Sequence, residues 1–332
     1  MYKNKIILLL QSQGFANFAA ILYDMIIHNG YEELKINSPV VTLGIFDGVH
    51  RGHRMLLDHL VSRAREKGGS SVVVTLSPHP RLVLEKDHLN LTFLTTLDEK
   101  KELLEKAGID HLVIINFSSE FSRIPACDFV RDILVGKIGT RHLIVGYDHH
   151  FGRSGEGDFE TIRQCSGLMD FRIEQLEGLE TADGAISSTL IREALLAGRL
   201  DDANNLLGYN YLLTGIVVEG KKIGRSMGFP TANIRPEVHK LIPANGVYAV
   251  EVLFDRNTYA GMLSIGTNPT INSSKGFRSI EVNILNFESE IYGKDITVVF
   301  RKRLRDEKKF DNISQLVDQM HIDKEETLKI IH

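Results

Sequence analysis

Two histidines three residues apart, His50 and His53, lie in a stretch whose neighbours suit phosphate chemistry. The stretch Val40–His53 reads VVTLGIFDGVHRGH: an apolar β-branched run typical of a buried strand, a glycine-containing turn, and the start of a helical pattern. Such a unit points backbone N–H groups and the positive end of a helix at a bound phosphate. The residues that we expect to contact a nucleotide here are Gly44, Phe46, Asp47, Gly48, His50 and His53.

Two histidines at this spacing can also have roles other than nucleotide binding. They are often ordinary surface residues or a metal-binding pair, although no cysteine or third ligand lies nearby in the sequence to complete a zinc site. The stretch is not a kinase-type phosphate loop, because no G-x-x-x-x-G-K-[ST] occurs. The strand and the turn before the histidines favour nucleotide binding.

Two later stretches in the first half carry further polar groups. Ser187, Ser188 and Thr189 precede a helical pattern, and Arg192 follows one turn into it. Hydroxyls there are good N-caps, and the same helix start can bind an anion, with Arg192 forking onto a phosphate. The glycine-bordered loop GYDHHFG contains Asp148, which can accept from a ring N–H or a ribose hydroxyl; it is otherwise read as a surface turn.

In the second half, three features stand out. A glycine-rich loop, GKKIGRSMGFPTAN, ends at Thr231 and Asn233, whose oxygen atoms suit Mg²⁺. Glu281 is a carboxylate in an otherwise apolar strand pattern and is equally well read as a solvent-facing position. The basic run Arg301–Phe310 in isolation is typical of a solvated edge.

The elements that must position these residues divide the chain in two. Strand and helix patterns alternate in the first half, which predicts a doubly wound parallel sheet with ligands at the carboxyl ends of its strands. The predicted strands there are 40–45, 71–76, 112–117 and 143–145, and the predicted helices are 54–67, 98–107 and 127–136. A short helix is expected at 198–208.

From residue 214 the pattern changes to short strands separated by turns, which predicts an antiparallel sheet or small barrel with a final helix at 313–331. We therefore expect an α/β domain at 25–207 and an all-β domain at 208–332. Residues 1–24 are expected to be a disordered or non-native extension. Because the first expected strand begins well after them, a chain starting at Met25 should keep its activity.

Composition argues against nucleic-acid-binding, disulfide-rich and membrane-spanning classes of protein. The 332 residues have a net charge of −4, which argues against a general nucleic-acid binder. The two cysteines, Cys127 and Cys165, form no disulfide framework or C-x-x-C motif, which fits a reducing cytoplasm. No apolar run is long enough for a membrane span.

The first-half motifs GIFDGVHRGH, TLSPHPR, GYDHHFGRSGEGD and ISSTLIR resemble, in this order, those of the bacterial bifunctional riboflavin kinase/FAD synthetase family. The resemblance implies that the N-terminal nucleotidyltransferase domain transfers AMP from ATP to FMN, and that Asp148 contacts the flavin. His149-His150 and Leu76-Ser77 depart from the common Phe-Arg and Phe-Asp of the family.

The second half is similar to the riboflavin kinase module of the same family, a six-stranded barrel with P-T-A-N, a late-strand glutamate and R-L-R-D-E-x-x-F. The resemblance implies that Thr231 and Asn233 hold nucleotide and Mg²⁺, and that Glu281 activates the ribityl hydroxyl. Asn283 stands where histidine is common. The remaining residues implied to bind ligand are Gly220, Lys222 and Gly224 for the nucleotide and Arg305 and Glu281 for the flavin.

We therefore expect riboflavin and two ATP to yield FAD through FMN, with Mg²⁺, and with His50, His53, Arg192 and Glu281 as the catalytic residues. Alternatives are a monofunctional enzyme with one degenerate module, a flavin- or nucleotide-sensing regulator, and a cytidylyltransferase. The last does not explain the barrel. We expect a cytoplasmic monomer or weak homo-oligomer without nucleic-acid or membrane partners.

Overall fold

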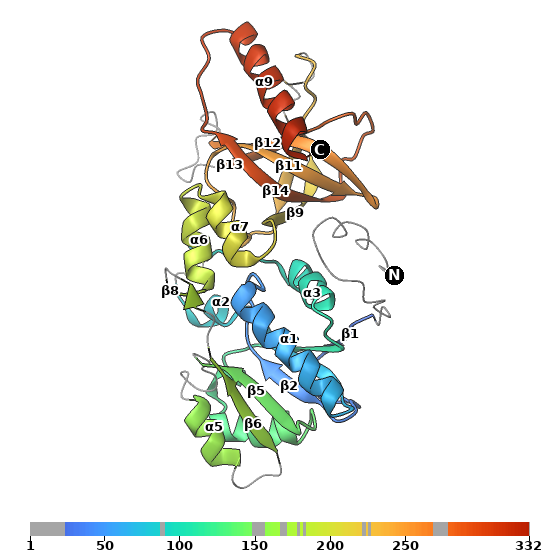
Figure 1. The fold of residues 1–332 in the computed structure, drawn as a ribbon, viewed down its shortest axis with the longest axis vertical. Coiled ribbons are helices and arrows are strands. Elements are labelled where there is room, and N and C mark those ends of the chain that lie inside the picture. The colour runs from blue at the N-terminus through green and yellow to red at the C-terminus, as the bar shows by residue number, and fades with distance from the viewer. Residues whose placement is uncertain are drawn as a thin grey trace. The chain divides into compact units, whose positions relative to one another are not determined.

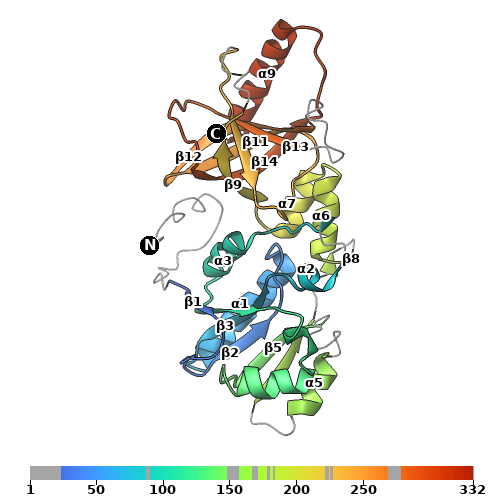
Figure 2. The ribbon, with the colours of Figure 1, turned by 180° about the vertical axis from the view of Figure 1, so that it is seen from behind.

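The structure is a computed structural model that describes residues 24–86, 90–147, 157–166, 171–177, 180–181, 184–220, 224, 227–267 and 278–331. The described residues form two compact units that divide between Ser188 and Thr189. Figures 1 and 2 show the elements of both units from opposite sides.

The first unit is built on a six-stranded parallel sheet, as the alternating sequence pattern predicted. Its strands, in the order β1-β4-β3-β2-β5-β6, are β1 (Ile26–Asn29), β4 (His111–Asn116), β3 (Ser71–Ser77), β2 (Val40–Leu43), β5 (His142–Gly146) and β6 (Arg172–Leu176). The chain builds outward from β2 through β3 and then returns to place β5 on the other side of β2. A ligand crevice is expected at such a change of direction, beyond the carboxyl ends of the strands.

Helices cover both faces of this sheet because alternate strand residues point in opposite directions. Helices α1 (Arg51–Glu66) and α3 (Leu97–Lys106) pack on one face, where the core contains Val40, Val73 and Leu112. The short α4 (Ala126–Asp128) and the π-helix η3 (Phe129–Val135) pack on the other face, against Val41, Val72 and Val113. Figure 1 shows α1 lying across the sheet. The remaining small elements are α2 (Pro80–Leu84), η2 (Phe121–Arg123), α5 (Phe159–Ser166), β7 (Glu180–Thr181) and β8 (Gly184–Ala185).

The expectation that the first strand begins well after the N-terminal extension is wrong. Strand β1 starts at Ile26, two residues after Asp24, and pairs with β4. The sequence pattern does not reveal β1 because it is an edge strand whose Ile26 and Ile27 are exposed, so it lacks the apolar periodicity of a buried strand. Met25 before it is buried, and its backbone N–H donates to Glu105 Oε1 at 3.3 Å.

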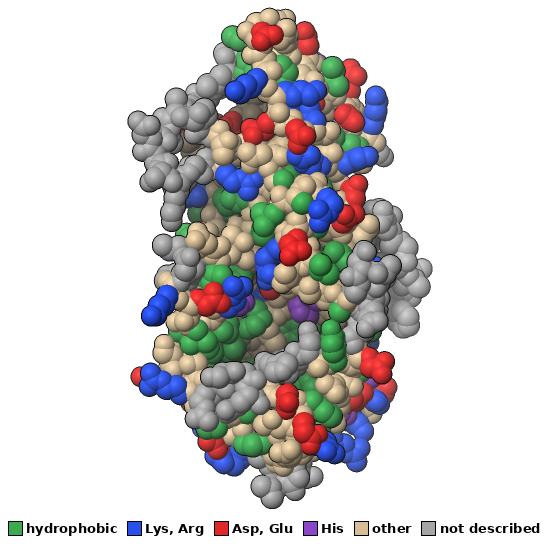
Figure 3. Space-filling view, turned by 90° about the vertical axis from the view of Figure 1, so that its left-hand side faces the viewer, with side chains coloured by type: hydrophobic (Ala, Val, Ile, Leu, Met, Phe, Trp, Pro, Cys, Tyr) green, Lys and Arg blue, Asp and Glu red, His purple; other side chains and the backbone are tan. Residues whose placement is uncertain are grey.

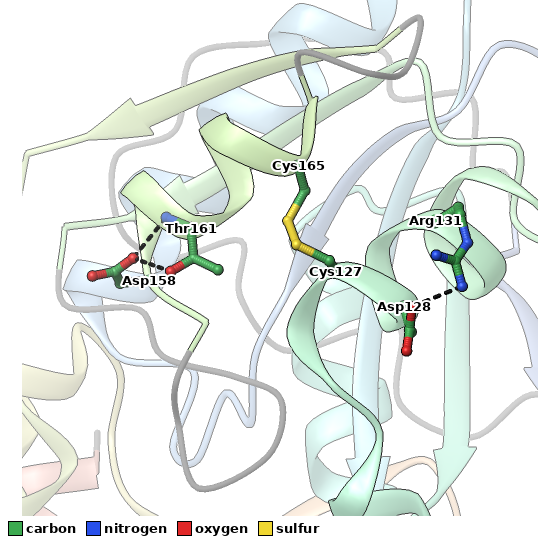
Figure 4. Close-up of a disulfide and its surroundings, with 6 residues drawn as sticks. All are labelled: Cys127, Asp128, Arg131, Asp158, Thr161 and Cys165. Carbon is green, nitrogen blue, oxygen red and sulfur yellow. Dashed lines mark hydrogen bonds and ion pairs between the residues drawn. A yellow bond between two sulfur atoms is a disulfide. The ribbon is translucent and has the colours of Figure 1, made fainter.

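The two cysteines are paired, against the prediction that they form no disulfide. Cys127 of α4 is bonded to Cys165 of α5, which lies 38 residues further along the chain (Figure 4). Helix α5 begins beside a local contact, in which Asp158 Oδ1 accepts from the Thr161 N–H at 2.8 Å. The pairing is not visible in the sequence because α5 is not predicted there and nothing else relates the two positions.

The second unit is a closed six-stranded antiparallel barrel with a C-terminal helix, as predicted. In barrel order its strands are β10 (Ala232–Pro236), β13 (Arg278–Ile284), β12 (Asn257–Thr267), β11 (Gly246–Phe254), β14 (Asp295–Arg305) and β9 (Leu212–Val218). The final helix α9 spans Ile313–Ile331, the range read from the sequence.

Two helices precede the barrel and belong to the same unit, α6 (Ser188–Leu196) and α7 (Leu200–Leu207). Asn204 ties α7 to the barrel, because its side chain donates to the Phe300 carbonyl at 3.2 Å and accepts from the Tyr211 N–H at 2.8 Å. The Leu195 carbonyl at the end of α6 accepts from the Ala244 N–H at 2.9 Å. These bonds explain why the unit begins before residue 208, the boundary expected from the sequence.

On the face shown in Figure 3, lysine and arginine side chains are interspersed with aspartate and glutamate. Within the described residues, every helix is too short or too polar to cross a membrane.

Candidate functional site

The turn after β2 has an unusual backbone. Phe46, Gly48 and Val49 have positive φ angles of 51°, 81° and 38°. Glycine adopts such angles without cost, but for phenylalanine and valine they are strained. Strain of this kind persists only where surrounding contacts enforce it, and it clusters at functional sites.

Asp47 and Thr95 enforce this backbone. The buried Asp47 carboxylate accepts from the Thr95 N–H at 3.1 Å, while the Thr95 hydroxyl oxygen accepts from the Gly48 N–H at 3.1 Å. The Ser188 hydroxyl donates to the Asp47 carbonyl at 2.8 Å. The predicted nucleotide contact Asp47 therefore has a role in holding the turn, and Thr95 is a supporting residue that the sequence analysis missed.

The two histidines lie together at the start of α1. His50 is the N-cap residue, and its Nδ1 accepts from the His53 N–H at 3.3 Å. This bond leaves the proton of a neutral His50 ring on Nε2, where it can be donated to a ligand. The two rings stack with centroids 3.6 Å apart, and the Phe46 ring contacts His53 edge-on at 5.1 Å.

His53 is a neutral imidazole at pH 7. Burial, reinforced by His50 and Lys100, holds its pKa well below 6.5. Its Nδ1 is buried and has no hydrogen-bond partner among the described residues. A buried ring nitrogen without a partner is a group that a bound ligand can satisfy.

The other predicted residues of the first site are placed as follows. A Cβ on Gly44 would lie 3.0 Å from the Phe46 ring, so glycine is needed for this ring to fold back over the strand end. Ser188 begins α6 and touches the turn through its hydroxyl, next to Ser187. Arg192 donates to the Thr189 hydroxyl at 3.4 Å, and both belong to the second unit. Asp148 lies outside the described residues.

In the barrel, three predicted residues come together across two neighbouring strands. Asn233 of β10 is paired in register with Glu281 of β13. The Thr231 hydroxyl, just before β10, donates to Glu281 Oε2 at 3.3 Å. Glu281 is half-buried rather than fully solvent-facing. The sequence separates these residues by about fifty positions, but the antiparallel register places their oxygen atoms in one group.

Close packing fixes the amide of Asn233. A Cβ on Gly220 would lie 2.0 Å from Asn233 Nδ2, so only glycine leaves room for that side chain. The buried Asn283, two residues after Glu281, donates to the Pro230 carbonyl at 2.7 Å and so fixes the backbone beside Thr231.

The loop between Gly220 and Thr231 is described in part. Gly224 accepts at its carbonyl from the N–H groups of Met227 and Phe229, at 3.1 and 2.9 Å. A Cβ at Gly224 would lie 2.2 Å from the Phe229 carbonyl oxygen. Lys222 lies outside the described residues.

Arg305, predicted to bind flavin, has a structural partner. Its guanidinium makes a two-point ion pair with the buried Asp323 of α9, with Nε–Oδ1 at 3.0 Å and Nη2–Oδ2 at 2.7 Å. This pair attaches the C-terminal helix to β14. A flavin contact from Arg305 stays a prediction.

Two family models match separate parts of the chain. A family model described as FAD synthetase matches residues 33–190, and one described as riboflavin kinase matches residues 207–331. The bifunctional riboflavin kinase/FMN adenylyltransferase of Listeria monocytogenes is 38% identical over 87% of this chain and 91% of its own length. The Bacillus subtilis protein of the same name is 36% identical over 87% of this chain and 92% of its own length.

A solved structure has the same fold over nearly the whole chain. It is described as a macrolide-efflux protein from Streptococcus pneumoniae, and it superposes with a TM-score of 0.82 at 32% identity. The match covers 92% of this chain and 98% of that one.

Proposed function

The chain belongs to the family of bifunctional riboflavin kinase/FMN adenylyltransferases, and we propose that each predicted domain carries one of the two active sites on the residues described above. The enzyme phosphorylates riboflavin with ATP to give FMN and then transfers AMP from a second ATP to FMN, giving FAD and pyrophosphate. The family models for both activities match, which disfavours the monofunctional and the purely sensing alternatives. The residue assignments below are proposals.

Adenylyl transfer takes place at the turn after β2. An FMN phosphate oxygen attacks the α-phosphorus of ATP, and the bond to the departing pyrophosphate breaks. The nucleophile is already an anion, so no base is needed. His50 and His53 donate ring N–H groups to phosphate oxygens, at positions fixed by the N-cap bond and by stacking. Gly44, Phe46 and Gly48 shape the turn, and Ser187 to Thr189 with Arg192 add donors at the start of α6.

Riboflavin phosphorylation takes place where β10 pairs with β13 in the barrel. The nucleophile is a neutral alcohol, which benefits from a base. Glu281 takes the hydroxyl proton as the oxygen attacks the γ-phosphorus of ATP, the bond from that phosphorus to the β,γ-bridging oxygen breaks, and ADP leaves. The Thr231 hydroxyl holds the Glu281 carboxylate in place at 3.3 Å. The loop of Gly220, Lys222 and Gly224 is proposed to contact the nucleotide, and Asp148 and Arg305 the flavins of the two sites.

Magnesium fits the donor set of the barrel site. Thr231 and Asn233 offer a hydroxyl and an amide oxygen next to a carboxylate, and all are hard oxygen ligands of the kind that Mg²⁺ accepts. When bound, the ion would neutralise phosphate charge during transfer. No group of three or more histidine, cysteine, aspartate or glutamate side chains suited to a metal occurs in the described part of the chain, and this site does not need one, since substrate phosphates complete the coordination.

The observation that carries the proposal is the convergence of Thr231, Asn233 and Glu281 in one unit and of His50 and His53 in the other. The test is to incubate the protein with riboflavin, ATP and Mg²⁺ and to separate the flavins by chromatography. Each half-reaction is then assayed alone, with riboflavin or with FMN as the flavin. Loss of FAD formation without Mg²⁺ would support the ion, and unchanged activity with excess chelator would contradict it.

Several assignments stay predictions: the functional boundary near Gly208, a cytoplasmic location, a monomer or weak homo-oligomer, and no nucleic-acid or membrane partner. Light scattering at several concentrations tests the oligomeric state directly.

A further inference from the structure

Lys100 is a buried charged side chain that none of the steps above uses. It lies in the first turn of α3, and the start of this helix is fixed by a reciprocal pair of bonds between Thr96 and Glu99, at 2.9 and 3.2 Å. Thr95, directly before, bonds to Asp47 and Gly48. The helix that carries Lys100 is therefore attached to the same turn that carries the histidines.

The ammonium group of Lys100 has no hydrogen bond or ion pair in the described part of the chain, although the residue is only 8% exposed. Its neighbour Lys101 behaves in the ordinary way, because its side chain is 27% exposed and pairs with Asp98 at 2.8 Å. An ammonium with so little solvent around it and no ion pair has lost part of its hydration without a full replacement. A bound anion would supply that replacement, which is a common reason for such a group at a ligand site.

The charged and titratable groups that act on Lys100 belong to the first site. Burial lowers the pKa of Lys100 to about 8, and the Asp47 carboxylate opposes this shift. Lys100 in turn helps to lower the pKa of His53, so the two side chains are close enough to interact through space. His53 also has a buried nitrogen without a partner, its Nδ1. A buried nitrogen of α1 without a partner and a nearby ammonium of α3 thus face one small region.

We propose that Lys100 is a third phosphate-binding group of the adenylyl-transfer site, and that its ammonium contacts the polyphosphate of ATP and the pyrophosphate that leaves. The inference rests on the proposed role of His50 and His53. The pKa of His53 lies well below 6.5, so its neutral ring supplies hydrogen bonds, and Lys100 supplies positive charge from inside the first unit. Lys100 forms and breaks no covalent bond, and the reaction balance is unchanged.

The competing role for Lys100 is purely structural, as a counter-charge to Asp47. The two roles differ in what they predict for ligand binding. A structural ammonium would matter for stability and leave pyrophosphate affinity unchanged, whereas a phosphate-binding ammonium would matter for affinity and rate.

The experiment compares Lys100→Met with the matched control Lys101→Met in the full chain. We expect Lys100→Met to reduce FAD formation from FMN and ATP by about 10²–10³-fold, the usual effect of removing one transition-state donor. Pyrophosphate binding, measured by calorimetry, should weaken in the same variant. FMN formation from riboflavin should be unchanged, and Lys101→Met should match wild type in both reactions.

The number of protons taken up on pyrophosphate binding is a second test, because a purely structural role of Lys100 would not change it. An anion bound to Lys100 raises its pKa from about 8, so pyrophosphate binding at pH 8.5 should take up on the order of half a proton more in wild type than in Lys100→Met. The uptake is obtained from the binding heat in two buffers of different ionisation enthalpy. Equal uptake in both proteins would overturn the proposal.

The outcomes separate this inference from the site assignment. If His53→Ala abolishes FAD formation while Lys100→Met retains wild-type rate and pyrophosphate affinity, Lys100 is structural and the proposal fails. If neither variant affects FAD formation, the assignment of the site itself fails. Should Lys100→Met not fold, Lys100→Gln, which keeps a polar end at similar length, is measured with the same expectations and the same grounds for rejection.

Discussion

Among single residues, Glu281 has the most specific proposed role, that of the general base in riboflavin phosphorylation. The Thr231 hydroxyl donates to its carboxylate, and Asn233 is its partner on the neighbouring strand. Replacing Glu281 with Gln keeps the shape and a hydrogen-bond acceptor but removes proton acceptance. FMN formation should fall about 10²–10⁴-fold, or roughly 3–5 kcal/mol of barrier, with little change in riboflavin affinity. FAD formation from supplied FMN should be normal.

The matched control for this variant is Glu288→Gln, which alters an exposed carboxylate just beyond the same strand. It should behave as wild type. A general base contributes about 10²–10⁴-fold to the rate. If Glu281→Gln kept more than about a tenth of the kinase activity, the loss would be too small for a base, and Glu281 would not have that role.

His53 is the corresponding test in the first unit. Replacing it with Ala removes a ring that stacks on His50 and has an unsatisfied buried nitrogen, and FAD formation should fall about 10²–10³-fold while FMN accumulates. His59→Ala is the control in the same helix, since His59 bonds to Glu174 at 2.6 Å and is not proposed to touch substrate. Equal FAD formation in both variants and wild type would make His53 a packing residue. A melting curve shows whether either variant is misfolded.

The sequence predicted the residues that lie in compact motifs and missed those that act from a distance. His50 with His53, and Thr231 with Asn233, are neighbours in the chain, so their spacing alone indicates a shared site. Thr95 lies just before α3 and Lys100 lies in α3, and nothing in their local sequence relates them to Asp47 or His53. The structural role of Arg305 was hidden for the same reason, because Asp323 lies on a helix eighteen positions away.

At the scale of elements, buried strands and amphipathic helices were predictable and edge elements were not. Strand β3 and helices α3 and α9 were predicted within a residue or two at each end, since their apolar spacing is regular. Strand β10 was missed because it begins within P-T-A-N and carries the polar groups of the site. Edge strand β1 has too few buried side chains to leave a pattern.

The disulfide between α4 and α5 gives a prediction at this scale. It closes a loop of 38 residues, for which chain entropy predicts about 4 kcal/mol of stability. For a unit of this size that is a melting shift on the order of 10 °C. Differential scanning calorimetry with and without dithiothreitol should show a lower melting temperature on reduction. The double variant Cys127→Ser, Cys165→Ser should melt at the same temperature as the reduced protein, and dithiothreitol should not change its melting temperature. Superimposable scans of all three samples would contradict the prediction.

At the scale of the whole molecule, the structure and the chemistry divide the chain at different places. Helices α6 and α7 are hydrogen-bonded to the barrel through Leu195 and Asn204, and the compact units divide at residue 188. Thr189 and Arg192 lie beyond that point, although the sequence predicts them as phosphate contacts in adenylyl transfer. The segment from 189 to 207 should therefore be needed by both activities for different reasons.

Four separate fragments test this division. A fragment of residues 24–207 should adenylylate supplied FMN, whereas one of residues 24–188 should fold but lose most of this activity, because it lacks Thr189 and Arg192. A fragment of residues 189–332 should phosphorylate riboflavin and melt higher than one of residues 208–332, which loses the Asn204 bonds to Phe300 and Tyr211. Those two bonds alone are worth about 1 kcal/mol each. Equal adenylyl transfer by the two N-terminal fragments would remove Arg192 from the site, and equal melting of the two C-terminal fragments would place the structural boundary at 208.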